Sequence, residues 1–424
     1  MKKMLLVGLL LVILAIIVIP YQSHAVPSFA RQVKKPCTAC HTIWPNLNQY
    51  GRQFKVKAYT DVSEEWDMIT KDNLSLPTTF PFSARVVLEP VVREDNSAAG
   101  IHQSSSEVGQ VAIFMASRIA SYAGIFTSAE ADGFSETSGG GTFTIPTVKA
   151  AFDYPLAEGT TIGLVVFAGL ATSADPFDSL GGRDRDLSFD ESLPFILNTG
   201  WTFNFWSSHN QGEVLHGYFL GNRLYAAVGV MRGGAADDGT LAGLKNSDNS
   251  DPNDTYARVA WDQKLSNGAV TLGVVNYNGT QRITAAPGGA SLYDSKVMRT
   301  YGDLSLEQNF GEDHIVEVQA LYGGGNDKNV LGGGEKGTFD GYYLQADYYY
   351  DRTYGVIGSL NDIKYSGTVE ATDPTKKQQW LIGLNYLPAL NTKIVFQYSS
   401  TKTTNQDGTS STDNINKIVV DLLF

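Results

Sequence analysis

The sequence has very few cysteines and few charged residues. Of 424 residues only two are Cys, and Asp, Glu, Lys and Arg together make up 18%. Two cysteines cannot build a disulfide framework or a four-thiolate metal site. Lys and Arg are scarcer than Asp and Glu, whereas nucleic-acid binding depends on positive charge that neutralises phosphates. We therefore expect no nucleic-acid partner, and the 21 Tyr and 20 Phe argue against a disordered chain.

Beyond its first 25 residues the chain has no apolar stretch approaching 18 residues, so we expect no transmembrane helix in the mature protein. The N-terminus has a pair of lysines, an apolar run over residues 4–19, a break at Pro20 and the small residues Ser23 and Ala25. This arrangement predicts a secretory signal peptide over residues 1–25. The alternative is an uncleaved membrane anchor, which needs about 17–25 apolar residues.

Both cysteines lie in one motif, Cys37-Thr38-Ala39-Cys40-His41. The spacing C-x-x-C-H is that of c-type haem attachment, in which two thiols match two vinyl groups and the histidine binds the iron. A zinc ribbon would need a second C-x-x-C pair, a thioredoxin-like pair would need a βαβ context, and a simple disulfide would leave His41 without a role. The motif predicts one covalently attached haem c, held by Cys37, Cys40 and the axial ligand His41.

Residues 26–76 are predicted to form the haem domain. About fifty residues are close to the lower limit for independent folding, so we expect the haem to supply much of the core. Within residues 26–80, the further soft or imidazole donor is Met68, a candidate for the distal iron ligand. The alternative for Met68 is an ordinary apolar contact.

From residue 80 onward, apolar and polar residues alternate with a period of two, which predicts β-strands. In residues 342–350, for example, one face carries Tyr, Leu and Ala and the other carries Gln and Asp among tyrosines. Short turns and long Gly/Asp/Ser/Thr-rich loops alternate between the strands, as in outer-membrane barrels. The turns are expected at 221–222, 266–268, 311–313, 351–352 and 388–391, near Ser117 and at 155–159. The loops are expected at 233–254, 278–295, 323–338, 362–376 and 402–414.

This pattern predicts an all-β fold: a 16-stranded antiparallel outer-membrane β-barrel over residues 80–424, with a small N-terminal monohaem cytochrome c domain. The barrel would contact outer-membrane lipid, and its two ends would lie on the periplasmic side because the strand number is even. The longest connection, 172–210, resembles the constriction loop of general porins; an additional hairpin at 201–206 is the alternative. A soluble β-protein would show the same alternation.

The stretch Pro27-Ser28-Phe29-Ala30-Arg31-Gln32, the haem motif, and then Pro45, Leu47, Gly51-Arg52 and Phe54-Lys55 resemble the N-terminus of the fused cytochrome–porin family. That family includes outer-membrane cytochromes that oxidise iron(II). The similar residues span some thirty positions, and the barrel half is similar only in length and architecture. The resemblance implies an electron-transfer protein that passes electrons from extracellular iron(II) to a periplasmic carrier. Such a protein would act as an iron(II) oxidase.

A single haem cannot bridge a hydrocarbon layer of ~30 Å, and residues 60–80 leave no long flexible linker. We therefore expect the haem domain to lie inside the barrel or at its periplasmic end. One alternative is a porin for small solutes whose haem domain gates or senses, which predicts an open lumen. Another is a soluble periplasmic cytochrome with a β-sheet substrate domain.

Charge is unevenly distributed along the chain. Without Lys2 and Lys3 the chain has 30 basic and 44 acidic residues, a formal charge of −14, yet residues 26–60 carry +6 and no acid. All the acidic residues therefore lie after residue 60, and most of them lie in the strand-rich part. Loop carboxylates there suit iron(II) as oxygen ligands or, equally, bridging divalent ions at the membrane surface. The loop candidates are Asp237, Asp238, Asp248, Asp251 and Asp254.

Overall fold

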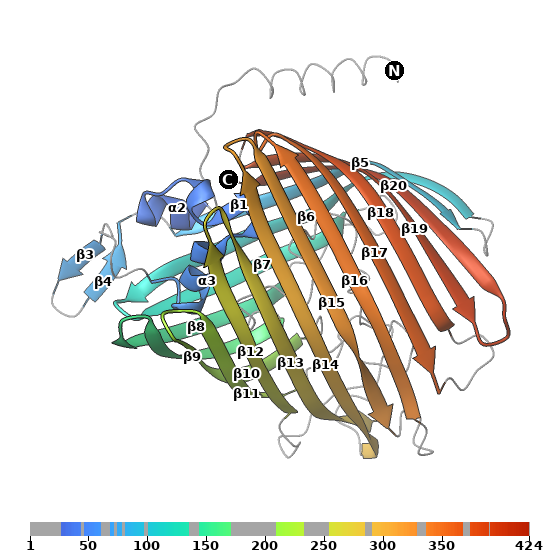
Figure 1. Ribbon diagram of the computed structural model, residues 1–424, viewed down its shortest axis with the longest axis horizontal. Helices are drawn as coiled ribbons and strands as arrows, with labels where there is room; N and C mark the ends of the chain where they lie inside the picture. Colours follow the sequence, from blue (N-terminus) through green and yellow to red (C-terminus); the bar gives the residue numbers. More distant parts are fainter. Residues whose placement is uncertain are drawn as a thin grey trace.

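The computed structural model describes residues 27–43, 46–60, 68–71, 74–78, 81–96, 101–134, 144–170, 209–232, 254–284, 291–328, 336–367, 374–389 and 391–423. Among these residues, sixteen strands close into one antiparallel barrel (Figure 1). The predicted all-β class and the sixteen-stranded antiparallel barrel are confirmed. No helix in the described ranges is long and apolar enough to cross a membrane. The predicted signal peptide, residues 171–208 and Phe424 lie outside the described residues.

The barrel strands follow one another in sequence order, and the first pairs with the last to close the ring. Their bounds are β5 Phe82–Asn96, β6 Ile101–Ala120, β7 Ala123–Phe134, β8 Thr144–Ala157, β9 Thr160–Leu170, β10 His209–Phe219, β11 Leu224–Arg232, β12 Asp254–Leu265, β13 Gly268–Thr284, β14 Ser291–Phe310, β15 His314–Lys328, β16 Lys336–Tyr350, β17 Tyr354–Ser366, β18 Pro374–Ala389, β19 Thr392–Asn405 and β20 Ser410–Leu423.

The alternation read from the sequence corresponds to the two faces of the barrel. Along β16 every second side chain is buried, from Phe339 through Gln345 and Asp347 to Tyr349, and the residues between them are exposed. The exposed set is apolar or aromatic where it covers the middle of the strand, as at Leu344. A strand turns successive side chains to opposite faces. The buried side chains, which include Gln345 and Asp347, therefore face the lumen, and the exposed side chains face outward.

Most short turns lie where they were predicted. Residues 220–223, 266–267, 311–313 and 351–353 connect strands, and the left-handed backbone of Gly221 and Gly311 (φ +72° and +70°) suits glycine. The turn predicted near Ser117 lies a few residues later, at 121–122, because β6 continues to Ala120. Ser117 is buried and faces the N-terminal segment, and a polar residue of this kind reads as a turn in the sequence although it lies within a strand.

The predicted long loops are also shorter than expected. β13 continues to Thr284, β14 begins at Ser291, and β19 and β20 are separated by residues 406–409 alone. Most of the extra strand residues are polar or Gly, which ladder pairing accommodates in a barrel wall that is polar on its inner side.

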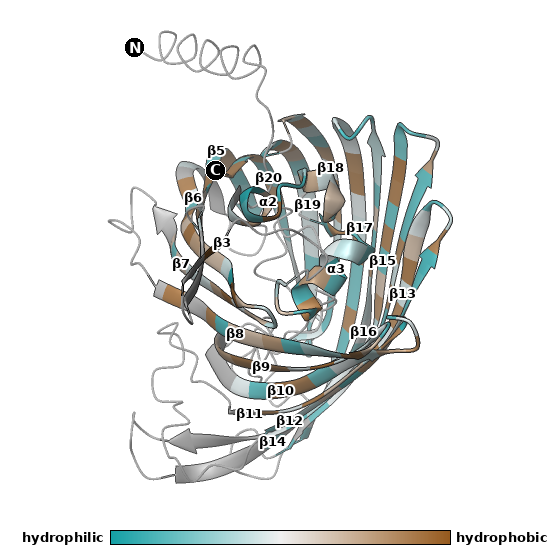
Figure 2. Cartoon of the chain, turned by 90° about the vertical axis from the view of Figure 1, so that its left-hand side faces the viewer, coloured by the Kyte–Doolittle hydropathy of each residue, from teal (hydrophilic) through white to brown (hydrophobic). Residues whose placement is uncertain are grey.

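The chain before the barrel forms two small units. The first contains helix α2 Pro27–Val33, the 3₁₀ turn η1 Cys37–Ala39, β1 His41–Ile43, β2 Asn46–Leu47 and helix α3 Gln49–Val56. Its described residues, 27–43 and 46–60, are called the plug below, because α2 and α3 lie within the ring of strands (Figure 2). The second unit is a separate two-stranded sheet of β3 Met68–Lys71 and β4 Leu74–Pro77.

Candidate functional site

The haem motif forms one tight turn. The N–H of Cys40 donates to the carbonyl oxygen of Cys37 at 3.1 Å, and the N–H of Ala39 donates to that of Pro36 at 3.0 Å. Proline fixes its own φ, and the extended Pro36 (φ −68°, ψ 160°) leads the chain into the turn. Neither cysteine is in a disulfide; Cys37 is buried and Cys40 is half-buried. Burial raises the pKa of the Cys37 thiol to about 11, so this thiol is neutral at pH 7.

Asn48 connects this turn to helix α3. Its Oδ1 caps the helix by accepting from the N–H of Gly51 at 2.9 Å, and its Nδ2 donates to the carbonyl oxygen of Ala39 at 3.1 Å. The N–H of Asn48 also donates to the carbonyl oxygen of Cys40 at 2.9 Å. Three bonds from one residue hold the cysteine turn against the helix.

Gly51 permits that close approach. A Cβ at this position would lie 2.1 Å from the carbonyl oxygen of Cys40, which is shorter than any real contact. Any larger residue would push the turn away from α3. His41 follows the turn as the first residue of β1, where it is buried and pairs with Leu47 of β2. The turn, the histidine and the helix therefore form one rigid unit.

Arg52 anchors this unit to the barrel. Its side chain is 1% exposed. Nη2 lies 3.1 Å from Asp262 Oδ1 on β12, and Nη1 pairs with Glu307 Oε1 on β14. Burial by itself lowers the pKa of the guanidinium, but Glu307 and Asp262 raise the pKa above its ordinary value. The arginine is therefore charged and joins the plug to two strands at once.

Further contacts link the plug to other parts of the wall. On one side, Gln32 Nε2 donates to the carbonyl oxygen of Ala116 at 2.8 Å, and Ser117 Oγ donates to Gln32 Oε1 at 2.9 Å. On the other, Thr42 Oγ1 donates to Glu307 Oε2 at 3.1 Å, and Arg352 in the turn after β16 donates to the carbonyl oxygen of Thr42. The plug thus sits at the end of the barrel that carries the short turns (Figure 1).

An aromatic cluster also joins the plug to the barrel wall. Phe29 contacts Phe54 edge-on and stacks on Tyr59, and Tyr59 in turn stacks on Phe126 of β7 at a centroid distance of 6.1 Å. Beside this cluster, a Cβ on Gly124 would lie 2.0 Å from the carbonyl oxygen of Ala58. The backbone of the plug therefore touches the backbone of β7 at a glycine.

The residues of the motif fit a c-type haem in their chemistry. Two cysteines outside any disulfide lie three residues apart in one turn, and a histidine follows directly. This is the donor set for two thioether links and an axial nitrogen. The other candidate, Met68, is the first residue of β3, and its side chain lies outside the described part of the structure. Its role as distal ligand stays a prediction.

Of the five predicted loop carboxylates, one lies within the described residues. Asp237, Asp238, Asp248 and Asp251 lie outside the described residues. Asp254 is wrongly predicted as a loop residue: it begins β12, is buried, and accepts a hydrogen bond from Tyr277 Oη. Within the described ranges, no group of three or more His, Cys, Asp and Glu side chains is arranged to hold a metal ion.

Sequence reasoning found the motif but missed its partners in the barrel. Asp262, Glu307 and Glu317 contact plug side chains 210, 255 and 271 residues away in sequence. The one available signal was their place on the polar face of alternating strands. That signal shows that a residue faces the lumen but does not say what it touches there.

Comparisons with known proteins concern the barrel. No family model matches the chain, and no curated protein matches it. Among solved structures, OmpT of Vibrio cholerae is similar with a TM-score of 0.50 and 11% identity, over 84% of this chain and 100% of that one. The anion-selective porin of Comamonas acidovorans gives 0.51 and 15%, over 81% and 98%. The channel DcaP of Acinetobacter baumannii gives 0.50 and 12%, over 81% and 96%.

These likenesses establish a porin-like barrel fold. The outward face supports the same conclusion, since large apolar side chains are exposed on it from β8 to β19. A closed barrel satisfies its backbone hydrogen bonds internally, and an apolar outer band suits it to lipid. The protein is an outer-membrane β-barrel of the porin type.

Proposed function

We propose that this barrel transfers electrons across the outer membrane through one c-type haem carried by the plug. Cys37 and Cys40 would form the two thioether links, and His41 would bind the iron. The observation that supports this function best is that the C-x-x-C-H turn is bonded to Asn48, the cap of helix α3. Helix α3 lies within the ring of strands (Figure 2) and is joined to the wall by the buried pairs of Arg52. When bound, the haem supplies a carrier for one electron at a time.

The residues around the motif have positioning roles. Asn48 and Gly51 keep the cysteine turn on α3, and Arg52 keeps α3 on the wall. When the haem gains or loses an electron, rigidly held surroundings need little rearrangement, because their dipoles are already oriented. As the resemblance to cytochrome–porin fusions implies, the donor would be extracellular iron(II) and the acceptor a periplasmic carrier.

The test is to reconstitute the full-length protein in liposomes and add iron(II) outside. We expect the haem absorbance to change to that of the reduced form. Cys37→Ala should lose one covalent link to the haem, and the matched control Thr38→Ala should keep both. Normal covalent haem in Cys37→Ala would contradict the site. Intact haem that iron(II) does not reduce would contradict the donor.

A second function, a porin for small solutes whose plug gates the lumen, is favoured by the fold comparisons. The similar structures are described as a channel and as an anion-selective porin. The two functions differ in conductance, because a gate must open, whereas an electron carrier works with the plug in place. Conductance of the wild-type protein in planar bilayers, without any added reductant, distinguishes them.

A further inference from the structure

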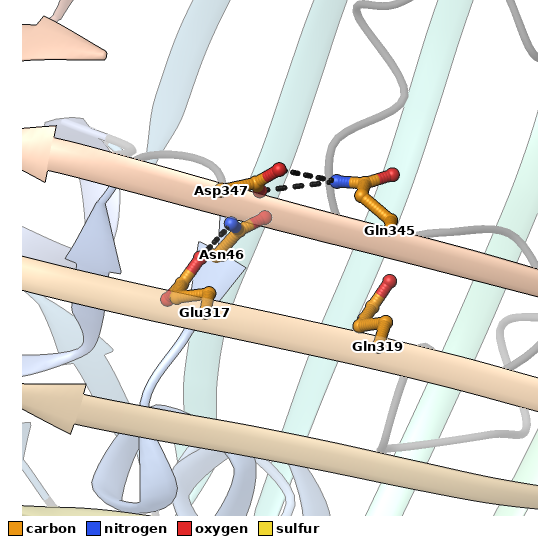
Figure 3. Close-up of a pocket in the computed structure, with 5 residues that line it drawn as sticks. All are labelled: Asn46, Glu317, Gln319, Gln345 and Asp347. Carbon is orange, nitrogen blue, oxygen red and sulfur yellow. Dashed lines mark hydrogen bonds between the residues drawn. The ribbon is translucent and has the colours of Figure 1, made fainter. Parts of the chain in front are cut away.

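A small polar pocket lies where the plug meets the wall. Five side chains line it (Figure 3). Asn46 comes from the plug, Glu317 and Gln319 come from β15, and Gln345 and Asp347 come from β16. Every one of these side chains carries oxygen, and two of them are carboxylates. The pocket therefore offers the ligand type that hard cations prefer.

The carboxylates belong to a row across three neighbouring strands. Glu307 of β14 pairs in register with Glu317 of β15, and Glu317 pairs with Asp347 of β16. All three face inward and are buried. Side chains directly opposite on adjacent strands lie about 5 Å apart at Cβ, and like charges in this position repel. Arg52 pairs with Glu307 at one end of the row, and the pocket lies at the other end.

Asn46 gives a second, independent indication of a ligand. The side chain is 2% exposed and reaches between Glu317 and Asp347 (Figure 3). Its Nδ2 donates to Glu317 Oε2, while its Oδ1 is buried without a hydrogen-bond partner. A buried acceptor without a partner is costly, and a cation in the pocket would satisfy it.

We propose that the pocket binds one hard divalent cation of the Ca²⁺ type. Its ligands are the carboxylates of Glu317 and Asp347 and the amide oxygens of Asn46 and Gln319. Bidentate carboxylates would bring the set to about six oxygens, within the six to eight that Ca²⁺ takes. Mg²⁺ usually keeps several waters, so a set made of protein oxygens suits Ca²⁺ better. Gln345 positions Asp347, since its Nε2 donates to both carboxylate oxygens at 3.2 and 3.0 Å.

The site would connect cation binding to the seating of the plug. One ligand, Asn46, belongs to the plug, and the other three belong to the wall. A ligand that binds only the assembled form stabilises that form, so the cation holds the plug in place. This inference does not depend on haem or on electron transfer, and it is tested without either.

The test measures Ca²⁺ binding to full-length protein in detergent after chelator treatment, by isothermal titration. We expect Glu317→Gln and Asp347→Asn each to weaken one site at least tenfold. Glu312→Gln, the same change in an exposed turn, is the matched control and should leave that site unchanged. Heat-modified mobility on gels reports whether each variant still forms a closed barrel.

Asn46 tests the contribution of the plug. Asn46→Leu should weaken the site as the wall variants do, and Asn46→Asp, which keeps an oxygen there, should retain it. Tb³⁺ provides an optical measurement of the same site. Tyr343 donates a hydrogen bond to Gln345, so it lies close enough to sensitise emission from the bound ion. Tyr343→Phe should lower this emission and leave the Ca²⁺ affinity intact. The proposal would be overturned if the wild-type protein showed no such Ca²⁺ site, or if Glu317→Gln and Asp347→Asn bound Ca²⁺ as tightly as the wild type. Unchanged affinity in Asn46→Leu would overturn the link to the plug.

Discussion

At the scale of residues, the plug depends on a few buried polar contacts. Arg52 is the clearest case, because one guanidinium bonds to carboxylates on two different strands and to the carbonyl oxygen of Leu47 at 2.8 Å. A buried ion pair adds little stability relative to apolar packing, but removal of one partner leaves uncompensated charge. The effect of mutation should therefore be large and local.

We expect Arg52→Ala to destabilise the seated plug by about 3–5 kcal/mol, because Asp262 and Glu307 would remain buried without their partner. Limited proteolysis of the protein in detergent measures this, since an unseated plug is cleaved while the barrel stays intact. Lys55→Ala, on the same helix and half-buried, is the control. Equal protection of the plug in Arg52→Ala and wild type would show that this contact does not hold it.

Cys37 should show a pH dependence in protein prepared without haem. Because burial raises the thiol pKa from 9.0 to about 11, the folded chain favours the neutral form. Its contribution to stability is present below pH 9 and is lost as the pH rises through 11. Alkylation of Cys37 should stay slow at pH 9 and accelerate towards pH 11, as read by mass spectrometry. In urea Cys37 should react like an ordinary thiol, and equally fast labelling in the folded protein at pH 9 would contradict its burial.

At the scale of elements, the sequence predicted strands better than it predicted their ends. The period of two was clear in β12, β15, β16 and β19, and the short turns at 311–313 and 351–353 carry residues with positive φ. The ends of β13 and β14 were missed because strand residues that face a polar lumen resemble loop residues in composition. Hydrophobic patterning carries no information where both faces of a strand are polar or glycine-rich.

The close approach of Ala58, just after α3, to Gly124 of β7 leads to a prediction at the level of elements. Gly124→Ala should unseat the plug, because the added Cβ would lie 2.0 Å from the carbonyl oxygen of Ala58. Gly302→Ala on β14 is the matched control, since its nearest atoms would be 3.9 Å away. Both variants should form closed barrels, and only Gly124→Ala should expose the plug to protease. Protection of the plug in Gly124→Ala would mean that β7 moves to accommodate the methyl group.

At the scale of the whole molecule, the location of the N-terminal segment could be predicted in part. A short linker after residue 60 favoured a domain inside the barrel, and α2 and α3 do lie within the ring of strands. The residues that receive it could not be predicted, because contacts between Arg52 and Asp262 or Glu307 depend on the closure of the barrel. Periodicity along one strand does not determine which strands face each other across a lumen.

Deletion of residues 26–60 should raise the conductance of the barrel in planar bilayers several-fold, since the plug occupies space within the ring of strands. The signal peptide is retained in this variant so that export is unchanged. Glu312→Gln, in an exposed turn, serves as a control for altered charge at the same end. Equal conductance with and without the plug would mean that the lumen is blocked by other parts of the chain.

The distances along the sequence between the plug and its anchors have a consequence for assembly. If the predicted signal peptide directs export, Arg52 leaves the cytoplasm before Asp262 and Glu307, which follow it by 210 and 255 residues, and Asn46 precedes Glu317 by 271 residues. Contacts of such long range form late in folding. The plug therefore makes these contacts only after β12, β14 and β15 are in place. Any covalent modification of the motif would be easiest before the barrel closes around it.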